Sequence, residues 1–280
     1  MRVAEGYGKA ALVTGASSGI GKAVADYLKD QGYHVYGGAR RVPADGGSQQ
    51  AGKDGGFLKM LRMDVRDDAS VRAAVEQVLA AEGDLGLVVN CAGFGLAGSV
   101  EDTTPEEARA QFETNFFGPL RVYRAVLPIM RRRGGGFIAT VSSVAGFIPL
   151  PFQSMYSASK FALEAMTESM RMEVAPFGIK VSLIEPGDIK TGFTSAREWV
   201  AAAKGDSVYK ERCRRAVAAM EKSELAGPGP EVVVRVLAGL MRAKNPPARV
   251  IVGAQYKLVG CLKRIVTDRF LEFVLVKMYS

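Results

Sequence analysis

The chain has 280 residues, a net charge of +8, three cysteines and one histidine. Hydrophobic residues make up 48% and charged residues 24%, the balance of a globular protein that buries a full core. The single His34 excludes a metal site built on two histidines, and it leaves a Ser-His-Asp triad only if His34 itself serves. The scattered Cys91, Cys213 and Cys261 give no disulfide framework or metal knuckle, so we expect no metal and a reducing compartment.

The positive charge does not indicate nucleic acid. Five arginines between residues 121 and 133 end a helical pattern before Gly134, where cations stabilise the negative end of a helix dipole. Because no basic run interleaved with aromatic residues accompanies them, we expect no nucleic-acid partner. The N-terminal residues lack a signal-peptide pattern, and no apolar run reaches the roughly 18 to 20 residues that span a bilayer. We therefore expect a cytoplasmic protein.

Short apolar runs alternate with helical patterns along the chain. The predicted strands are residues 10–14, 34–39, 58–63, 87–90, 137–142, 181–185 and 250–253. The predicted helices follow residues 15–21 to about Gln31, then cover 68–81, 104–133 and 156–177, with Thr104 as a cap before Pro105. This alternation predicts an α/β protein: a doubly wound Rossmann fold with seven parallel strands and a single domain over residues 1–280.

Three segments fall outside the alternation. Residues 43–56 carry five glycines and almost no apolar residue, which predicts a mobile loop in place of a helix. Residues 192–229 show no strand pattern and predict a helical substrate flap over the carboxyl edge of the sheet. Residues 254–280 form a C-terminal extension in which basic and apolar residues alternate.

A glycine-rich turn follows the first strand and reads Gly15-Ala16-Ser17-Ser18-Gly19-Ile20-Gly21. Glycine lets the backbone approach a pyrophosphate closely, and the N-terminus of the next helix stabilises its negative charge. The spacing differs from the usual Gly-x-Gly-x-x-Gly fingerprint, but its place between a strand and a helix still predicts a dinucleotide site.

The end of the second strand decides which ribose is preferred. An acid there would accept hydrogen bonds from a free 2′-hydroxyl, whereas this sequence has Ala39 followed by Arg40 and Arg41. Because an arginine can grip a phosphate with two hydrogen bonds, we predict NADP(H) as the cofactor. The alternative interpretation is that both arginines are solvated loop charges.

Tyr156 and Lys160 lie one helical turn apart, and Ser143 ends the fifth strand thirteen residues before Tyr156. A carbonyl that accepts a hydride needs a proton donor, and the reverse reaction needs a base. The ordinary tyrosine pKa is ~10, and the ammonium of Lys160 together with an oxidised nicotinamide ring would lower it. Ser143 would position the carbonyl oxygen by a hydrogen bond.

Five motifs in order along nearly the whole chain resemble the short-chain dehydrogenase/reductase family. They are residues 14–21, Asn90-Cys91-Ala92-Gly93, Asn115, Ser143 with Tyr156 and Lys160, and Pro186-Gly187 with Thr191. Residues 150–164 are most similar to hydroxysteroid and retinol dehydrogenases within that family. Cys91 is a departure, because a second asparagine is usual at that position.

The resemblance implies a role for each motif residue. Tyr156, Lys160 and Ser143 would be catalytic, and Asn115 would hold a water that relays protons through Lys160, or serve only as a helix-kink residue. Asn90 would steady the sheet and line the adenosine-ribose side of the site, next to Ala92 and Gly93. The adenine would contact Asp64 and Val65, unless Asp64 only begins a helix. The nicotinamide side would be formed by Pro186, Gly187, Ile189 and Thr191.

The candidate substrate residues are mainly apolar, and no Lys or Arg stands among them to bind a carboxylate. Besides Ser143, they are Phe94, Leu150, Phe152, Met155, Phe193 and Trp199, with Leu96 and Val144 as further candidates. This composition favours a hydrophobic ketone or secondary alcohol, steroid-like or retinoid-like, over a sugar or an acid. We expect about half of these side chains to belong to the core instead.

The sequence thus predicts an NADP(H)-dependent oxidoreductase. The alternatives are a non-catalytic NADP(H)-binding sensor or scaffold of the same fold, and a reductase of another carbonyl compound such as an aldehyde. We expect a homodimer or homotetramer. The C-terminal extension has three open interpretations: it packs against the domain or a partner chain, it covers the substrate cleft, or it lies on an anionic membrane as an amphipathic helix.

Overall fold

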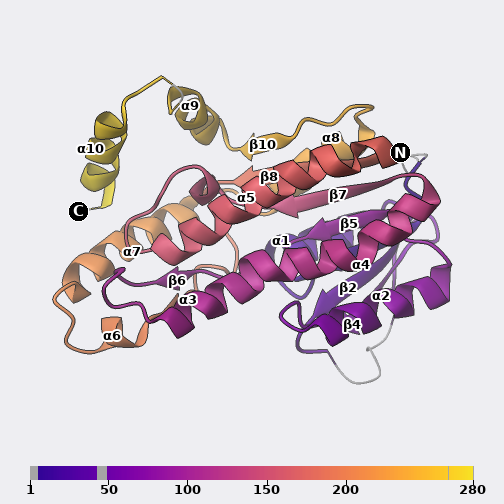
Figure 1. Ribbon diagram of the computed structural model, residues 1–280, viewed down its shortest axis with the longest axis horizontal. Helices are drawn as coiled ribbons and strands as arrows, with labels where there is room; N and C mark the ends of the chain where they lie inside the picture. The colour runs from indigo at the N-terminus through magenta and orange to yellow at the C-terminus, as the bar shows by residue number, and fades with distance from the viewer. Residues whose placement is uncertain (1–5, 43–48, 264, 280) are drawn as a thin grey trace.

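The computed structural model describes residues 6–42, 49–263 and 265–279, which form a central sheet flanked by helices (Figure 1). The parallel strands are β1 (Ala10–Thr14), β2 (His34–Ala39), β4 (Phe57–Arg62), β5 (Leu87–Asn90), β7 (Gly136–Val141), β8 (Ile179–Pro186) and β10 (Arg249–Val252). Their order is β10-β8-β7-β5-β1-β2-β4, so successive strands are added toward one edge of the sheet from β1 to β4 and toward the other edge from β5 to β10. The predicted seven parallel strands and doubly wound α/β fold are confirmed.

An eighth strand extends the sheet at one edge. β3 (Gln50–Ala51) pairs antiparallel with β4, because the turn that follows it closes with a 2.8 Å hydrogen bond from Gly52 N to Gly56 O. Asp54 and Gly55 have positive φ in this turn, and glycine adopts that conformation without strain. The prediction of a loop over residues 43–56 is therefore wrong for β3, and residues 43–48 lie outside the described residues.

Helices cover both faces of the sheet because alternate side chains of each strand point to opposite sides. Leu12 of β1 packs into the core under α2, α4 and α5, whereas Val13 packs into the core under α1 and α8. Sequence patterns give no prediction for α8, the second of the two helices on that face. The helices are α1 (Gly19–Lys29), α2 (Asp68–Glu82), α3 (Pro105–Phe112), α4 (Gly118–Arg133), α5 (Ser154–Val174), α6 (Ala201–Lys204), α7 (Lys210–Ala226), α8 (Glu231–Arg242), α9 (Ala254–Leu262) and α10 (Asp268–Tyr279).

The long helix predicted over 104–133 is interrupted. Thr104 caps α3 in a capping box: the Glu107 carboxylate accepts a hydrogen bond from Thr104 N, and the Thr104 hydroxyl accepts one from Glu107 N. A π-helical turn over Glu113–Phe117 then separates α3 from α4. Such turns insert an extra residue into the helical ladder and are frequent at functional sites. Asn115 lies in this turn.

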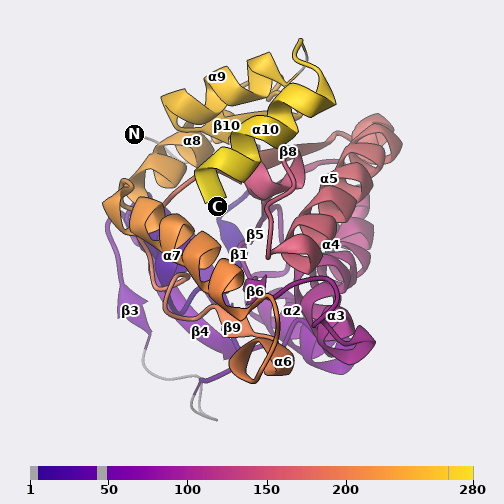
Figure 2. The ribbon, with the colours of Figure 1, turned by 90° about the vertical axis from the view of Figure 1, so that its left-hand side faces the viewer.

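The predicted flap over 192–229 contains α6 and α7 but is not entirely helical. β9 (Glu198–Trp199) pairs in parallel with β6 (Leu96–Ala97), so two residues from the flap and two from the loop after β5 form a separate small sheet. Figure 2 shows α7 and this small sheet in front of the end of the central sheet. The prediction that residues 192–229 contain no strand is thus wrong, because a two-residue strand such as β9 leaves no periodicity in the sequence.

The C-terminal extension forms two helices that follow β10 along one edge of the molecule (Figures 1 and 2). α9 contacts β10, and α10 contacts α7. Among the described residues, no helix combines the length and the apolar content that crossing a bilayer requires.

Candidate active site

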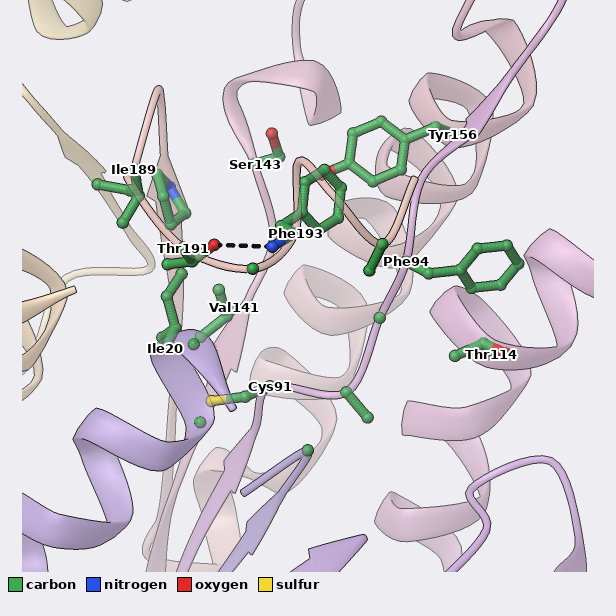
Figure 3. Close-up of a pocket in the computed structure, with 18 of the residues that line it drawn as sticks. Ile20, Cys91, Phe94, Thr114, Val141, Ser143, Tyr156, Ile189, Thr191 and Phe193 are labelled. Atoms are coloured by element: carbon green, nitrogen blue, oxygen red, sulfur yellow. Dashed lines mark hydrogen bonds between the residues drawn. The ribbon is translucent and has the colours of Figure 1, made fainter. Parts of the chain in front are cut away.

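A cavity of about 380 Å³ opens at the carboxyl ends of the central strands, beside the neighbouring strands β1 and β5 at which the strand order reverses. Figure 3 shows side chains from distant parts of the chain, including Ile20, Cys91, Tyr156 and Thr191, turned toward it. Most predicted cofactor residues line this cavity, whereas Arg41 and Asn90 do not. Those that line it are Gly15, Ser17, Ser18, Gly19, Ile20, Gly21, Arg40, Asp64, Val65, Ala92, Gly93, Tyr156, Lys160, Pro186, Gly187, Ile189 and Thr191.

The glycine-rich turn is packed too closely for side chains at two of its glycines. Gly15 has φ +66°, and a Cβ there would lie 2.9 Å from Ala92 Cα. A Cβ on Gly21 would lie 2.3 Å from the Gly15 carbonyl oxygen. Ser18 caps α1 without a side-chain hydrogen bond to the helix, so its hydroxyl does not occupy the first-turn N–H groups. These features fit the pyrophosphate of a dinucleotide held at a helix N-terminus.

The adenosine end of the cavity carries two arginines and one acid. Asp64 forms a two-point ion pair with Arg66, with distances of 3.0 Å from Nε to Oδ1 and 2.8 Å from NH2 to Oδ2. The hydrogen bonds from Arg66 lower the pKa of Asp64. Arg40 also lines the cavity, near enough to lower that pKa further. Arg66 is a residue that sequence reasoning missed, although it stands directly after the Asp64-Val65 pair.

The resemblance to the family places Asn90 beside the adenosine ribose, whereas the structure buries Asn90 in the sheet. Its side chain is 3% exposed, and its amide has no hydrogen-bond partner among the described residues. Thr14, at the end of β1, connects this strand to the loop after β5: its hydroxyl accepts hydrogen bonds of 3.1 Å from both Cys91 N and Ala92 N. Asn90 is therefore buried in the sheet and does not line the cavity, and the two roles that the resemblance implies for it stay predictions.

Ser143, Tyr156 and Lys160 converge on the same cavity. Tyr156 is buried, and burial raises its pKa to about 12, opposed by a hydrogen bond from Ser143. In the protein alone, desolvation of the phenolate outweighs the hydrogen bond from Ser143 and the charge of Arg197, while the expected lowering of this pKa by Lys160 together with an oxidised nicotinamide ring stays a prediction. Tyr156 is consequently a neutral phenol, ready to donate a proton, at neutral pH.

Lys160 lies beneath Tyr156 in the cavity wall. Its Nζ is 5.9 Å from the centre of the Tyr156 ring and donates a 3.0 Å hydrogen bond to Val141 O. Burial lowers the pKa of Lys160 to about 8, while the charge of Glu164 opposes that change. The ammonium form therefore predominates at neutral pH and is lost just above it.

Glu164, one helical turn after Lys160 on α5, belongs to a charged cluster. Glu164 accepts a 2.8 Å hydrogen bond from Ser142 Oγ, and Arg249 on β10 lies 3.3 Å from its other oxygen. The same arginine pairs with Glu168 at 2.6 Å and Glu185 at 3.5 Å. Burial raises the pKa of Glu164, and the hydrogen bond from Ser142 counters it. This cluster, which sequence reasoning missed, joins α5 to the end of β7 and to the edge strand β10.

Asn115 does not line the cavity, because its side chain is bound to the loop after β5. Its Oδ1 accepts a 3.1 Å hydrogen bond from Phe94 N, and its Nδ2 donates to Phe94 O at 3.0 Å and to Ser159 Oγ at 3.2 Å. The side chain thus fixes Phe94 between the π-helical turn and α5. The expected water relay remains a prediction, and the side-chain amide serves a positioning role.

The predicted substrate residues divide between cavity and core. Phe94, Leu150 and Phe193 line the cavity with Val144, and the Phe193 ring lies 5.7 Å from the Tyr156 ring (Figure 3). A hydrogen bond of 3.2 Å from Phe193 N to Thr191 Oγ1 holds that loop. The remaining candidates do not line the cavity and pack in two small apolar clusters: Leu96, Phe152, Met155 and Trp199.

The C-terminal extension supplies two tyrosines that sequence reasoning missed. Tyr256 on α9 and Tyr279 on α10 both line the cavity. The Tyr256 ring lies so close to Gly187 that a Cβ there would clash at 1.9 Å, and its hydroxyl donates a hydrogen bond to Asp188. The structure places α9 and α10 at the rim of the cleft, which corresponds to the second of the three interpretations of this segment, that it covers the cleft.

The fold and the site together define an oxidoreductase that uses a nicotinamide dinucleotide. A phosphate cradle lies at the switch point of a doubly wound sheet, and a serine, a tyrosine and a lysine lie at its nicotinamide side. A family model described as short chain dehydrogenase matches residues 9–200. The chain belongs to the short-chain dehydrogenase/reductase family, as its motifs predict, and is an NAD(P)-dependent oxidoreductase.

Characterised relatives match over most of the chain. It is 38% identical to a 3-ketodihydrosphingosine reductase of Bacteroides thetaiotaomicron over 96% of this chain and 97% of that protein. It is 40% identical to human 17-beta-hydroxysteroid dehydrogenase type 1, over 65% of this chain and 57% of that protein.

Solved structures share the fold. A short-chain dehydrogenase from Streptomyces avermitilis superposes with a TM-score of 0.79 at 32% identity, covering 93% of this chain and 94% of that one. A short-chain dehydrogenase from Burkholderia cenocepacia, solved in complex with NADP, gives a TM-score of 0.70 at 26% identity and covers both chains completely (100%).

Proposed function

We propose that the protein reduces a ketone on a long apolar substrate with NADPH. The observation that carries this proposal is the neutral phenol of Tyr156, which faces a cavity lined by Phe94, Leu150 and Phe193. A proton donor next to an apolar wall suits a carbonyl carried by a hydrocarbon-rich molecule.

Four residues of this chain have separate roles in the proposed carbonyl reduction. A nicotinamide held by the residues around Pro186, Gly187 and Thr191 would supply the hydride. The Ser143 hydroxyl donates a hydrogen bond to the carbonyl oxygen and orients it, while Tyr156 donates its proton to the developing alkoxide. Lys160, as an ammonium, stabilises the tyrosinate that this transfer leaves behind. Phe193 excludes water from the same side of the cavity by packing toward Tyr156.

NADPH is the proposed cofactor because Arg40 and Arg66 line the adenosine end of the cavity. A 2′-phosphate carries negative charge that both guanidinium groups attract, and arginine binds phosphate at two points. Asp64 is already paired with Arg66, so its carboxylate is less able to repel the phosphate. Arg40 is exposed and has no ion-pair partner among the described residues, which leaves it available.

The charges on the substrate side favour a neutral or cationic substrate over an acid. Glu224 lines the cavity, and its charge acts on Tyr156 by raising the pKa of that phenol. Arg197 pairs with Glu224 from behind, and Thr194 Oγ1 donates a 2.6 Å hydrogen bond to it. A long-chain amino ketone, such as the substrate named for the Bacteroides relative, would place its ammonium toward this carboxylate.

The test is the loss of NADPH absorbance with a panel of hydrophobic carbonyl compounds: 3-ketodihydrosphingosine, 17-ketosteroids, retinal, a fatty aldehyde and a long-chain keto acid. We expect turnover with a long-chain ketone and the poorest turnover with the keto acid. Preference for the keto acid or the fatty aldehyde would contradict the proposal.

The non-catalytic alternative is tested by Tyr156→Phe. We expect turnover to fall by roughly 10²- to 10⁴-fold, the usual contribution of general acid catalysis, with NADPH binding retained. A wild-type protein that binds NADPH but turns over none of these carbonyls would instead indicate a sensor or scaffold.

A further inference from the structure

The outer faces of α9 and α10 expose an unusual number of apolar side chains. Half of the large hydrophobic residues that are exposed in the described chain lie within residues 258–278. On α9 and just beyond it, Leu258, Leu262 and Ile265 recur at helical spacing, with Ile265 82% exposed. On α10, Phe270 and Phe273 are 55% and 64% exposed.

The inner sides of the same two helices are not free. Tyr256 and Tyr279 line the active-site cavity, and Lys263 donates a hydrogen bond to Phe147 O. α10 also contacts α7, the helix that carries Glu224 on the substrate side. The extension therefore has one side at the rim of the cleft, and its outer surface exposes Leu258, Leu262, Ile265, Phe270 and Phe273.

Cations accompany this apolar surface. Lys257, Arg269 and Lys277 are exposed on α9 and α10. In the sequence, residues 254–280 carry five basic residues against the acids Asp268 and Glu272, a net charge of +3. Exposed aromatic and aliphatic side chains flanked by cations match a helix that lies in the interface of a membrane with anionic lipids.

We propose that α9 and α10 dock this protein on the surface of an anionic lipid bilayer, with Leu258, Leu262, Ile265, Phe270 and Phe273 in the interface. A second copy of the chain fits less well, because a two-fold contact through this face would bring the same cations together.

The test is co-sedimentation of the full-length protein with vesicles, which needs neither substrate nor cofactor and so is independent of the proposed reaction. We expect sedimentation with phosphatidylcholine vesicles containing phosphatidylglycerol, and weaker sedimentation with phosphatidylcholine alone or at high salt. The double substitution Phe270→Glu with Phe273→Glu should lower the partition coefficient about tenfold or more, because two aromatic side chains no longer enter the interface.

The matched control is Met172→Glu with Val208→Glu, which adds the same charge at two residues that are 70% and 87% exposed elsewhere. It should keep most of the binding. Equal losses in both double variants, or no sedimentation of the wild type with anionic vesicles, would overturn the proposal. A dimer in solution that only the Phe270 and Phe273 variant dissociates would assign the face to a second copy instead.

Discussion

At the scale of single residues, the site depends on how burial sets the charge of each group. Tyr156 and Lys160 are both buried, and burial favours the neutral form of each, raising the pKa of the phenol and lowering that of the amine. Tyr156 therefore stays protonated at neutral pH, and the pKa of Lys160, about 8, lies close to neutral pH. Glu164 partly offsets the effect on Lys160 with its negative charge.

The first residue-scale prediction concerns the cofactor phosphate. Arg40→Asp should lower kcat/KM for NADPH by roughly 10- to 100-fold relative to NADH, because a charged hydrogen bond is lost and a like charge is introduced. Steady-state kinetics with both cofactors measures this ratio. Arg41→Asp is the matched control, since Arg41 is exposed but does not line the cavity. If the control changes the ratio as much as Arg40→Asp does, the assignment of Arg40 is wrong.

The second residue-scale prediction concerns pH. The Lys160 ammonium is present below its pKa of about 8 and is lost above it, so ketone reduction should decline as pH rises through that value. Glu164 raises the pKa of Lys160, so Glu164→Gln should move this decline to lower pH while keeping an acceptor for Ser142. The pH profile of kcat/KM is the measurement.

The control for the pH prediction is Glu168→Gln, which removes a carboxylate of the same cluster that pairs with Arg249. The decline should stay near its wild-type position in this variant. A shift of the Glu164→Gln profile to higher pH would contradict the electrostatic role assigned to Glu164.

At the scale of elements, backbone conformation decides what a glycine contributes. Gly239 lies inside α8 with no atom within 4 Å of a Cβ placed on it. Gly83 ends α2 with the same open space, but its φ is +70°. The two positions differ in conformation and not in room, so they separate helix propensity from left-handed strain.

The element-scale prediction uses this pair of glycines. Gly239→Ala should raise the free energy of unfolding by about 0.5 to 1 kcal/mol, because alanine loses less backbone entropy in a helix. Gly83→Ala should lower it by roughly 1 to 2 kcal/mol, because an L-residue is strained in the left-handed region. Urea unfolding followed by circular dichroism measures both changes, and effects of the same sign would contradict the argument.

At the scale of the whole molecule, the C-terminal segment contributes to a cavity whose other residues lie earlier in the sequence. Tyr279 lines the cavity together with Gly15 and Tyr156, which lie far away in the sequence. The adjacent Met278 is 59% exposed and does not line it. The C-terminal extension therefore lines the cavity as well as forming an outer surface.

The whole-molecule prediction follows from the position of Tyr279 in the cavity lining. Tyr279→Ala should raise KM for a hydrophobic ketone by roughly five- to tenfold, because it removes apolar area from the cleft. The Kd for NADPH should change little, as measured by fluorescence titration. Met278→Ala, the neighbouring control, should leave both constants unchanged. An equal rise in KM for the two variants would show that Tyr279 has no special place in the cleft.

The sequence by itself determined the parallel sheet and the phosphate cradle. Runs of apolar residues and the turn around Gly15, Gly19 and Gly21 depend on local backbone preference and burial, which sequence spacing records. The lysine and tyrosine on one helical turn are visible for the same reason. Membership of the family follows from these motifs together.

Only the tertiary structure decided which side chains meet. Arg66, Glu224, Tyr256 and Tyr279 reach the cavity from separate elements, and no local pattern marks them. Tertiary packing also placed Phe152, Met155 and Trp199 in small cores rather than in the cleft. The direction of the Tyr156 pKa was likewise beyond the sequence, because desolvation depends on every neighbour that the fold brings around the phenol.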